Sequence, residues 1–311
     1  MSESLATEHT ATYHETDDTL SRQIVRGVLN SKEATFWLTV GLIILSIALL
    51  APWIAPQDPY DLMVLDIMDS RMPPGTKNFD ESLTYWLGTD GQGRDMLSAI
   101  MYGLRTSISV GVMAGVIALI LGMILGLTGS YFGGWVDALI MRTVDLMLGF
   151  PTILVALILL SVLGQGVDKV IMALVAVQWA NYARVVRSAA LVEREKEYIE
   201  AATCLGLGHW RILFKHLLPN CLPPVIVIGT VQVAHAISAE ATLSFLGLGV
   251  PITEPSLGLL IANGYQLLLS GMYWISFFPG VVLLLTIFSI NIVGDRIREI
   301  LNPRLLQEGE N

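Results

Sequence analysis

Charged residues are scarce in this chain of 311 residues. They make up 14% of the sequence, whereas soluble domains usually carry about 25%. Hydrophobic residues make up 53%, and the mean hydropathy is +0.63. At this length, such a composition excludes an ordinary soluble enzyme and indicates a polytopic membrane protein. The net charge of −9 also argues against nucleic acid as a partner.

Cysteine is almost absent, because the chain holds only Cys204 and Cys221. Two cysteines are too few for a disulfide scaffold. Both fall in or beside a segment that we expect in the cytoplasm, where thiols stay reduced. We therefore expect no disulfide.

The motifs that carry chemistry are also missing. The chain has no G-x-x-x-x-G-K-[ST] loop for nucleotide phosphates, no H-E-x-x-H and no G-x-S-x-G. Its five histidines show no metal-ligand spacing. The apolar stretches show no pocket of convergent polar groups. We therefore expect no bound cofactor, no metal site and no covalent chemistry in this chain, which argues against an intramembrane enzyme.

Six apolar stretches favour membrane helices. A helix of about 20 residues crosses a hydrocarbon core of ~30 Å at 1.5 Å per residue. The stretches cover 36–54, 106–128, 146–167, 168–188, 225–237 and 272–294. They predict an all-α membrane protein with six transmembrane helices.

The basic residues set the orientation of these helices. Six Lys and Arg residues occur between 184 and 215, and none occurs between 241 and 272. Cytoplasmic loops carry the excess of Lys and Arg. Both termini are therefore expected in the cytoplasm, and the acid-rich segment 55–104 is expected outside. Within that segment we predict a short helix on the outer membrane surface, which feeds the second span.

This topology divides the chain into four parts. Residues 1–33 are predicted to form a cytoplasmic N-terminal tail, and residues 34–104 the first transmembrane helix with the external segment. Residues 105–296 hold the other five transmembrane helices and a cytoplasmic loop at 193–220. Residues 297–311 form a cytoplasmic C-terminal tail.

The 193–220 loop is the most informative segment. Its sequence predicts two short helices separated at 206–208, where Gly206 and Gly208 allow a sharp turn. Pro219 is expected to end the second helix. Ala201 and Ala202 are small, so another surface can approach the backbone closely. On these grounds alone, the loop is either a solvated connection or a docking element.

The loop resembles the EAA loop of permeases in ABC importers. The resemblance rests on Glu200-Ala201-Ala202, on a glycine after three more residues, and on His-Leu-Leu-Pro nine residues later. The sequence from His216 to Asn220 resembles the corresponding sequence in the branch of that family that handles peptides and nickel. The resemblance implies a type I ABC importer permease fold, with 105–296 as the permease core. It also implies that the loop forms coupling helices seated in a cleft of a cytoplasmic ATPase subunit. The coupling residues that it implies are Glu200, Ala201, Ala202, Gly206, Leu207, Gly208, His216 and Pro219.

A second resemblance lies ahead of the second span. The sequence Trp-Leu-Gly-Thr-Asp at 86–90, followed by Gly-Arg-Asp at 93–95, resembles a signature of the C-type permease of dipeptide and oligopeptide importers. Arg94 can pair with a carboxylate, and the aspartates can cap turns. Two roles stay open: a structural one and direct contact with a binding protein. The residues of this external signature are Gly88, Thr89, Asp90, Gly93, Arg94 and Asp95.

Glu240 is an ionisable residue at the end of an apolar span, so it is a candidate functional site. It either lines the solute pathway or forms hydrogen bonds at an interface. The second alternative is favoured.

The resemblance implies a permease subunit that moves peptides, or similar small solutes, inward across a bacterial plasma membrane by alternating access. The implied partners are a second homologous permease, two cytoplasmic ATPase subunits that bind ATP and Mg, an external solute-binding protein and the lipid bilayer. A nickel or other non-peptide permease of the same branch is the alternative. A different class, an ATP-independent channel or secondary transporter, would need intramembrane acids, and the apolar stretches are poor in them.

Overall fold

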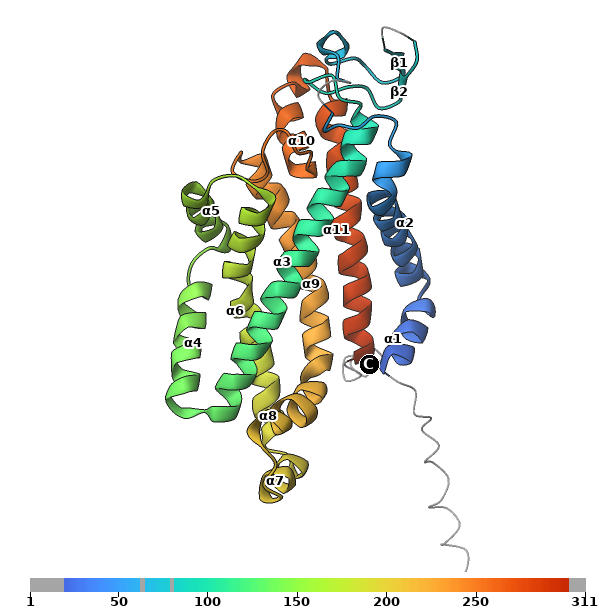
Figure 1. Cartoon of the computed structure of the whole chain (residues 1–311). Helices are drawn as coiled ribbons and strands as arrows, with labels where there is room; N and C mark the ends of the chain where they lie inside the picture. Colours follow the sequence, from blue (N-terminus) through green and yellow to red (C-terminus); the bar gives the residue numbers. More distant parts are fainter. Residues whose placement is uncertain (1–19, 62–64, 79–80, 302–311) are drawn as a thin grey trace, which may run out of the picture.

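The computed structural model describes residues 20–61, 65–78 and 81–301 of the chain. This part of the molecule is an elongated bundle of helices with one small hairpin at an end (Figure 1), as the all-α prediction requires. The remainder of the predicted tails, at 1–19 and 302–311, lies outside the described residues. The helices are α1 Leu20–Leu29, α2 Lys32–Ile54, α3 Met96–Phe132, α4 Gly134–Leu148, α5 Thr152–Leu163, α6 Val167–Arg194, α7 Glu197–Cys204, α8 His209–Arg211, α9 Leu218–Phe245, α10 Leu257–Tyr265 and α11 Trp274–Leu301. The hairpin pairs β1 Thr76–Lys77 with β2 Thr84–Tyr85 in antiparallel register.

Several of these helices can cross a membrane. The segments α2, α3, α11 and His209–Phe245 are each long and apolar enough for one span. Helices α4 and α5 reach the same apolarity together, as a pair bent by 90°. The chain is thus a multi-pass membrane protein. Helix α6 has 28 residues, or about 42 Å of helix, which exceeds a ~30 Å core. The predicted number of six spans is compatible with these elements and stays a prediction.

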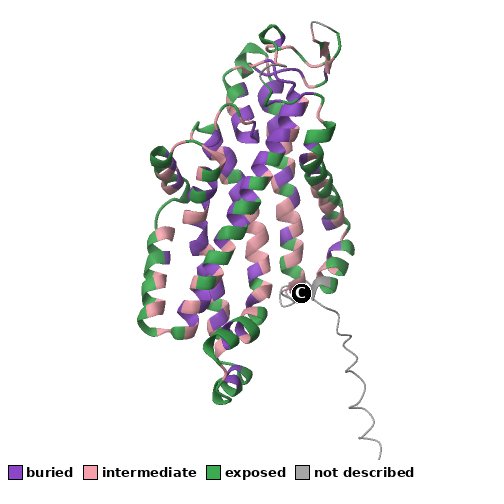
Figure 2. Ribbon diagram, in the orientation of Figure 1, coloured by how far each residue is buried: buried purple, intermediate pink, exposed green. Residues whose placement is uncertain are grey.

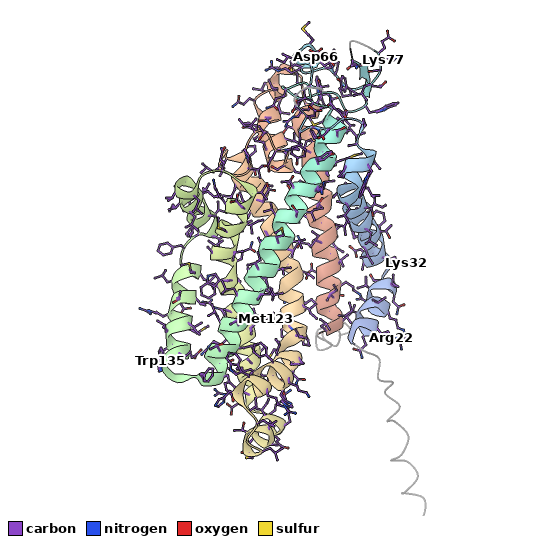
Figure 3. The ribbon with its side chains drawn as sticks, viewed as in Figure 1. Arg22, Lys32, Asp66, Lys77, Met123 and Trp135 are labelled. Atoms are coloured by element: carbon purple, nitrogen blue, oxygen red, sulfur yellow. The ribbon has the colours of Figure 1, made fainter. Side chains whose placement is uncertain are left out.

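The two ends of the bundle carry different segments of the chain. Helix α7, helix α1 and the end of α11 lie at one end, and the β-hairpin lies at the other (Figure 1). Arg22 and Trp135 belong to the first end, whereas Asp66 and Lys77 belong to the second (Figure 3). Arg296 near the end of α11 donates to the carbonyl O of Gly27 in α1 at 3.3 Å. The described parts nearest the two termini therefore lie on the side that carries the basic 193–220 loop.

The close contact between α3 and α6 forms the centre of the bundle. Buried residues concentrate on α3 and α6, whereas α2 and α5 present many exposed residues (Figure 2). Gly122 and Gly126 of α3 let the two backbones meet, because a Cβ on Gly122 would lie 2.7 Å from the carbonyl O of Trp179 and one on Gly126 would lie 2.6 Å from that of Ala183. This small-residue spacing is typical of packed membrane helices.

The prediction of a separate surface helix ahead of the second span is wrong. Its residues are the first turns of α3, which continues unbroken from Met96 to Phe132. The predicted boundary between 104 and 105 therefore falls inside this helix. Apolar residues of this segment are buried inside the protein and do not lie on a membrane surface, because Ile100 and Leu104 pack with Leu257 and Trp274.

The stretch 146–167, predicted as one continuous helix, is broken in the structure, although α4 and α5 together count as one bent candidate span. Helix α4 ends at Leu148 and α5 begins at Thr152, with a bend of 90° between them. Pro151 explains the break, because proline lacks an N–H group and disfavours helical geometry in the residue before it.

Pro219 does not end the helix that contains it. The chain passes from α8 through a π-helical stretch, Ile212–Leu217, directly into α9, where Pro219 occupies the first turn. The wider turn of a π-helix changes the hydrogen-bonding register. A proline at this point therefore removes no bond that the helix needs.

Candidate functional site

The 193–220 loop projects from the end of the bundle opposite to the β-hairpin (Figure 1). Helix α7 ends at Cys204, and α8 begins at His209. Between them, Gly206 adopts a φ of +70° and donates its N–H to the carbonyl O of Thr203 at 2.9 Å. The left-handed region costs a residue with a Cβ about 1–2 kcal/mol. The two-helix elbow predicted from the sequence is present.

The inner side of the loop packs on the ends of three long helices. Buried apolar residues of α7 and of the π-helical stretch form one cluster with residues of α3, α6 and α9. The members are Leu127, Val186, Ala190, Ile199, Ala202, Ile212, Leu213, Leu217, Cys221 and Val225. Because packed cores transmit displacement, a movement of the loop also moves the ends of these helices.

Polar contacts attach the loop to α3 at two points. Arg194 donates from Nη1 to the carbonyl O of Ser130 at 2.6 Å. The hydroxyl of Tyr131 lies 2.7 Å from Nδ1 of His209. The last turn of α3 thus holds both the beginning and the middle of the loop.

A buried carboxylate fixes the junction between α6 and α7. Glu193 accepts hydrogen bonds from Nζ of Lys196 at 2.9 Å and from the hydroxyl of Tyr198 at 2.8 Å. Partial burial, together with this hydrogen bond to Glu193, raises the pKa of Tyr198 to about 12. The phenol therefore remains a hydrogen-bond donor throughout the physiological pH range.

The outer side of the loop exposes apolar side chains. Leu205, Trp210 and Phe214 are 79%, 70% and 48% exposed. The rings of Trp210 and Phe214 stack with centroids 5.7 Å apart. Large exposed apolar groups that lie close together are typical of surfaces that contact another protein or the membrane. The sequence analysis missed them, although the i, i+4 spacing of the two aromatic residues could have indicated one helical face.

The structure divides the predicted coupling residues between the two sides of the loop. Those with exposed positions are Glu200, Ala201, Gly206, Gly208 and Pro219. Those that are buried or half-buried are Ala202, Leu207 and His216. The carbonyl O of His216 accepts from the amide of Asn220 at 2.7 Å. His216 thus lies in the helix that leads into α9.

The external signature residues are all buried. Arg94 and Asp90 are each 1% exposed and form an ion pair, in which Nε of Arg94 donates to Oδ2 of Asp90 at 2.7 Å. The hydroxyl of Thr89 donates to the carbonyl O of Asp69 at 2.6 Å. Asp95 accepts the N–H of Ser98 at 2.9 Å and thereby caps α3. Gly88 and Gly93 both have positive φ. These contacts favour the structural role over direct contact with a binding protein.

Glu240 is completely buried between α3 and α9. Its carboxyl group accepts hydrogen bonds from the hydroxyls of Ser107 and Ser244, both at 2.7 Å. The side chain thus links two membrane helices. This geometry favours the hydrogen-bonded role over a position on the solute pathway.

We expect Glu240→Leu to lower the apparent melting temperature of the purified protein, whereas Glu240→Gln should have a small effect. Leucine leaves two buried hydroxyls without their partner, at about 1–3 kcal/mol each. Glutamine keeps the shape and can bond both hydroxyls, because a hydroxyl rotates to donate or accept. Thermal unfolding in detergent measures the difference. Equal melting temperatures for the two variants would contradict this role.

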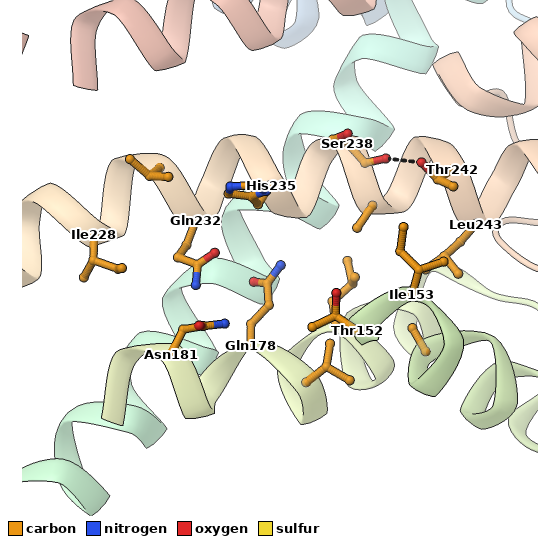
Figure 4. Close-up of a pocket in the computed structure, with 15 residues that line it drawn as sticks. Thr152, Ile153, Gln178, Asn181, Ile228, Gln232, His235, Ser238, Thr242 and Leu243 are labelled. Carbon is orange, nitrogen blue, oxygen red and sulfur yellow. Dashed lines mark hydrogen bonds between the residues drawn. The ribbon is translucent and has the colours of Figure 1, made fainter. Parts of the chain in front are cut away.

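A cavity with both apolar and polar lining residues lies between α5, α6 and α9, with a volume of about 410 Å³ (Figure 4). It corrects the expectation that the apolar stretches form no pocket of convergent polar groups. Its polar lining residues are Thr152, Gln178, Asn181, Gln232, His235, Ser238 and Thr242. The i, i+3 pairs of polar residues on α6 and α9 were the sequence signal for it.

Metal ligands do not gather in the part of the chain that the structure describes. No group of three or more His, Cys, Asp and Glu side chains there could hold an ion. The hydrogen bonds of Glu193 and Glu240 are satisfied by neighbouring side chains.

Comparison with known proteins identifies the relatives of the chain. Residues 118–307 match the family described as binding-protein-dependent transport system inner membrane component. The chain is 39% identical over 277 residues to the dipeptide transport system permease protein DppC of Escherichia coli (strain K12), covering 89% of this chain and 91% of that protein. It is 35% identical over 280 residues to DppC of Bacillus subtilis (strain 168), covering 90% and 84%.

The fold is also found among solved structures. A chain of the MetNI methionine ABC transporter in inward facing conformations superposes with a TM-score of 0.54 at 20% identity, covering 67% of this chain and 98% of that one. At this identity the likeness concerns the fold alone.

Proposed function

This chain belongs to the family of binding-protein-dependent transport system inner membrane components, and from this premise we propose that it is the permease subunit of an ATP-driven importer for peptides. It is a transport subunit and not an enzyme. It lies in the plasma membrane of a bacterium, with both termini cytoplasmic and residues 105–296 as the permease core. Solute moves inward by alternating access, in which largely rigid helix bundles rock around a central passage.

The exposed apolar end of the 193–220 loop carries this proposal. A cytoplasmic ATPase subunit covers Leu205, Trp210 and Phe214, which are otherwise exposed. Glu200, exposed on α7, makes polar contacts at the edge of the same surface. The inner side of the loop is packed on α3, α6 and α9. Closure of the ATPase pair thus moves the loop and the helices together.

The complete transporter needs further subunits. A second, homologous permease completes the passage, two ATPase subunits bind ATP and Mg, and an external binding protein delivers the solute. The relatives in Escherichia coli and Bacillus subtilis are named for dipeptide transport, which supports peptides as the solute. Nickel or another small solute of the same branch is the alternative. An ATP-independent channel or secondary transporter is the alternative of another class.

We expect Glu200→Arg to lower ATP-driven uptake at least tenfold, while the chain still inserts in the membrane. Bringing like charges together at an interface costs several kcal/mol, and a factor of ten corresponds to about 1.4 kcal/mol. The measurement is uptake of a labelled dipeptide by cells, together with co-purification of the ATPase subunits.

Glu33→Arg serves as the matched control, because Glu33 is also exposed and lies in the first turn of α2, away from the loop. Uptake should continue in this variant. Normal uptake and normal ATPase binding in Glu200→Arg would contradict the proposed docking surface. Uptake that persists after deletion of the ATPase subunits would favour the channel or secondary transporter.

A further inference from the structure

The cavity between α5, α6 and α9 has polar side chains on two facing walls. Gln178 and Asn181 extend from α6 toward Gln232 of α9, and His235 lies one turn further along α9 (Figure 4). Apolar residues such as Leu174 complete the lining. A volume of about 410 Å³ falls within the range of small-molecule sites, about 300–1,000 Å³.

One of these amides lacks a partner. Gln178 is 6% exposed, and its Oε1 atom forms no hydrogen bond among the described residues. Gln232 is 7% exposed on the opposite wall. A buried carbonyl group without a partner costs about 1–3 kcal/mol. A flip of the terminal amide exchanges its oxygen and nitrogen, so this side chain can present either an acceptor or a donor to the cavity.

The chemistry of the lining selects the kind of group that fits. None of the cavity residues is Asp, Glu, Lys or Arg, so a charged group entering the cavity would lose its hydration without a counter-charge. The side-chain amides of Gln178, Asn181 and Gln232 each offer one carbonyl oxygen and two N–H donors. An uncharged peptide group offers the complementary pair, one N–H and one C=O. Peptide groups therefore match the lining better than isolated charges do.

We propose that this cavity is a passage site for the peptide backbone, in which Gln178 and Gln232 exchange amide hydrogen bonds with the peptide group of the passing solute. The inference rests on the proposed function, because it names what the importer recognises during transport. The site binds the peptide backbone and not the side chains, so that solutes with different side chains make the same contacts during transport.

The test compares two solutes in the complete transporter, reconstituted in vesicles with its ATPase subunits, second permease and binding protein. The first solute is dialanine, which has a single peptide N–H. The second is its depsipeptide, in which an ester oxygen replaces that N–H group. Initial rates are measured with both solutes saturating, and each protein is described by the ratio of its own two rates, so that protein yield cancels.

In the unchanged protein, loss of the N–H group should lower uptake roughly two- to tenfold, the equivalent of one hydrogen bond. In Gln178→Met, dialanine uptake should fall by a similar factor, and the ratio of the two rates should approach one. Gln232→Met tests the opposite wall and replaces the first variant if that one does not fold. Gln23→Met is the matched control, because Gln23 is exposed on α1, and its ratio should equal that of the unchanged protein.

A second measurement decides the case in which the depsipeptide is not transported at all. Gln178→Cys is introduced with Cys204→Ser and Cys221→Ala, and the complete transporter is treated with N-ethylmaleimide. Saturating dialanine should slow labelling several-fold at this position and leave labelling of a Gln23→Cys control unchanged.

The inference is overturned if the ratio of the two uptake rates in both Gln178→Met and Gln232→Met equals the ratio of the unchanged protein. It is also overturned if dialanine does not slow the labelling of Gln178→Cys, or if Gln178→Cys is not labelled even without dialanine. The last result would show that this position is not reached from the cavity. If the unchanged protein transports neither solute with ATP, the proposed function fails instead, and the two failures are thus distinguished.

Discussion

Gly206→Pro is expected to abolish ATP-driven uptake while the chain still inserts in the membrane. Gly206 has a φ of +70°, and proline is restricted to about −65°. Proline also lacks the N–H group that Gly206 donates to Thr203. The elbow must therefore rearrange, and α7 loses its angle to α8. We expect uptake to fall by roughly a hundredfold or more, since proline costs about 3 kcal/mol or more where it breaks a helix, and a factor of ten corresponds to about 1.4 kcal/mol.

The same substitution two residues later provides the control. Gly208 has a φ of −62° and a ψ of 146° at the start of α8, which proline adopts readily. A Cβ at this position would meet nothing within 4 Å. Gly208→Pro should therefore retain most uptake. Membrane fractionation establishes insertion of both variants, and uptake of labelled dipeptide with co-purification of the ATPase measures coupling. Equal uptake in the two proline variants would contradict a role for the angle between α7 and α8.

The membrane helices could be predicted from the sequence where a long apolar run leaves few alternatives. The stretches 36–54 and 272–294 correspond to α2 and α11, each extended by several residues at an end. In lipid, backbone polar groups must be satisfied within the segment, which selects the helix. The elbow at Gly206 was predictable for a local reason, because glycine supplies the positive φ that a sharp reversal requires.

The break between α4 and α5 was harder to predict from the sequence, because some prolines in this protein interrupt a helix and others do not. Pro151 separates two helices, whereas Pro223, Pro224 and Pro279 lie inside α9 and α11. Packing by neighbouring helices decides which prolines are tolerated. A sequence read one segment at a time does not contain that information.

The polar cavity was missed for a related reason. Gln178 and Gln232 are far apart in the sequence, and they belong to two different helices, α6 and α9. Only the packing of α6 beside α9 brings them to the same cavity. The external signature is the opposite case, because the pairing of Arg94 with a carboxylate was predictable from the residues themselves. Its burial was not, since Arg94 also contacts Ile252, in the distant connection between α9 and α10.

Arg94→Met is expected to have the largest effect on stability. The ion pair between Arg94 and Asp90 is 1% exposed at both residues, and Nη1 of Arg94 also donates to the carbonyl O of Ile252 at 3.4 Å. Removing one partner of a buried pair leaves an uncompensated charge and costs about 3–5 kcal/mol. At about 2–4 °C per kcal/mol for a chain of this size, we expect the apparent melting temperature to fall by roughly 10 °C.

The double variant Asp90→Asn/Arg94→Met separates the ion pair from the loss of packing. Asp90 also accepts the N–H groups of Gln92 and Arg94 through Oδ1, at 2.8 and 3.0 Å. Asparagine keeps this acceptor and removes the charge. The double variant should therefore melt at a higher temperature than Arg94→Met alone.

Arg94→Lys should have an intermediate melting temperature, because a lysine ammonium cannot reach Asp90 and Ile252 with the two-sided geometry of a guanidinium. If Arg94→Met melts within about 1 °C of the unchanged protein, the ion pair contributes little, and the external segment is held by its backbone hydrogen bonds and by the capping of α3.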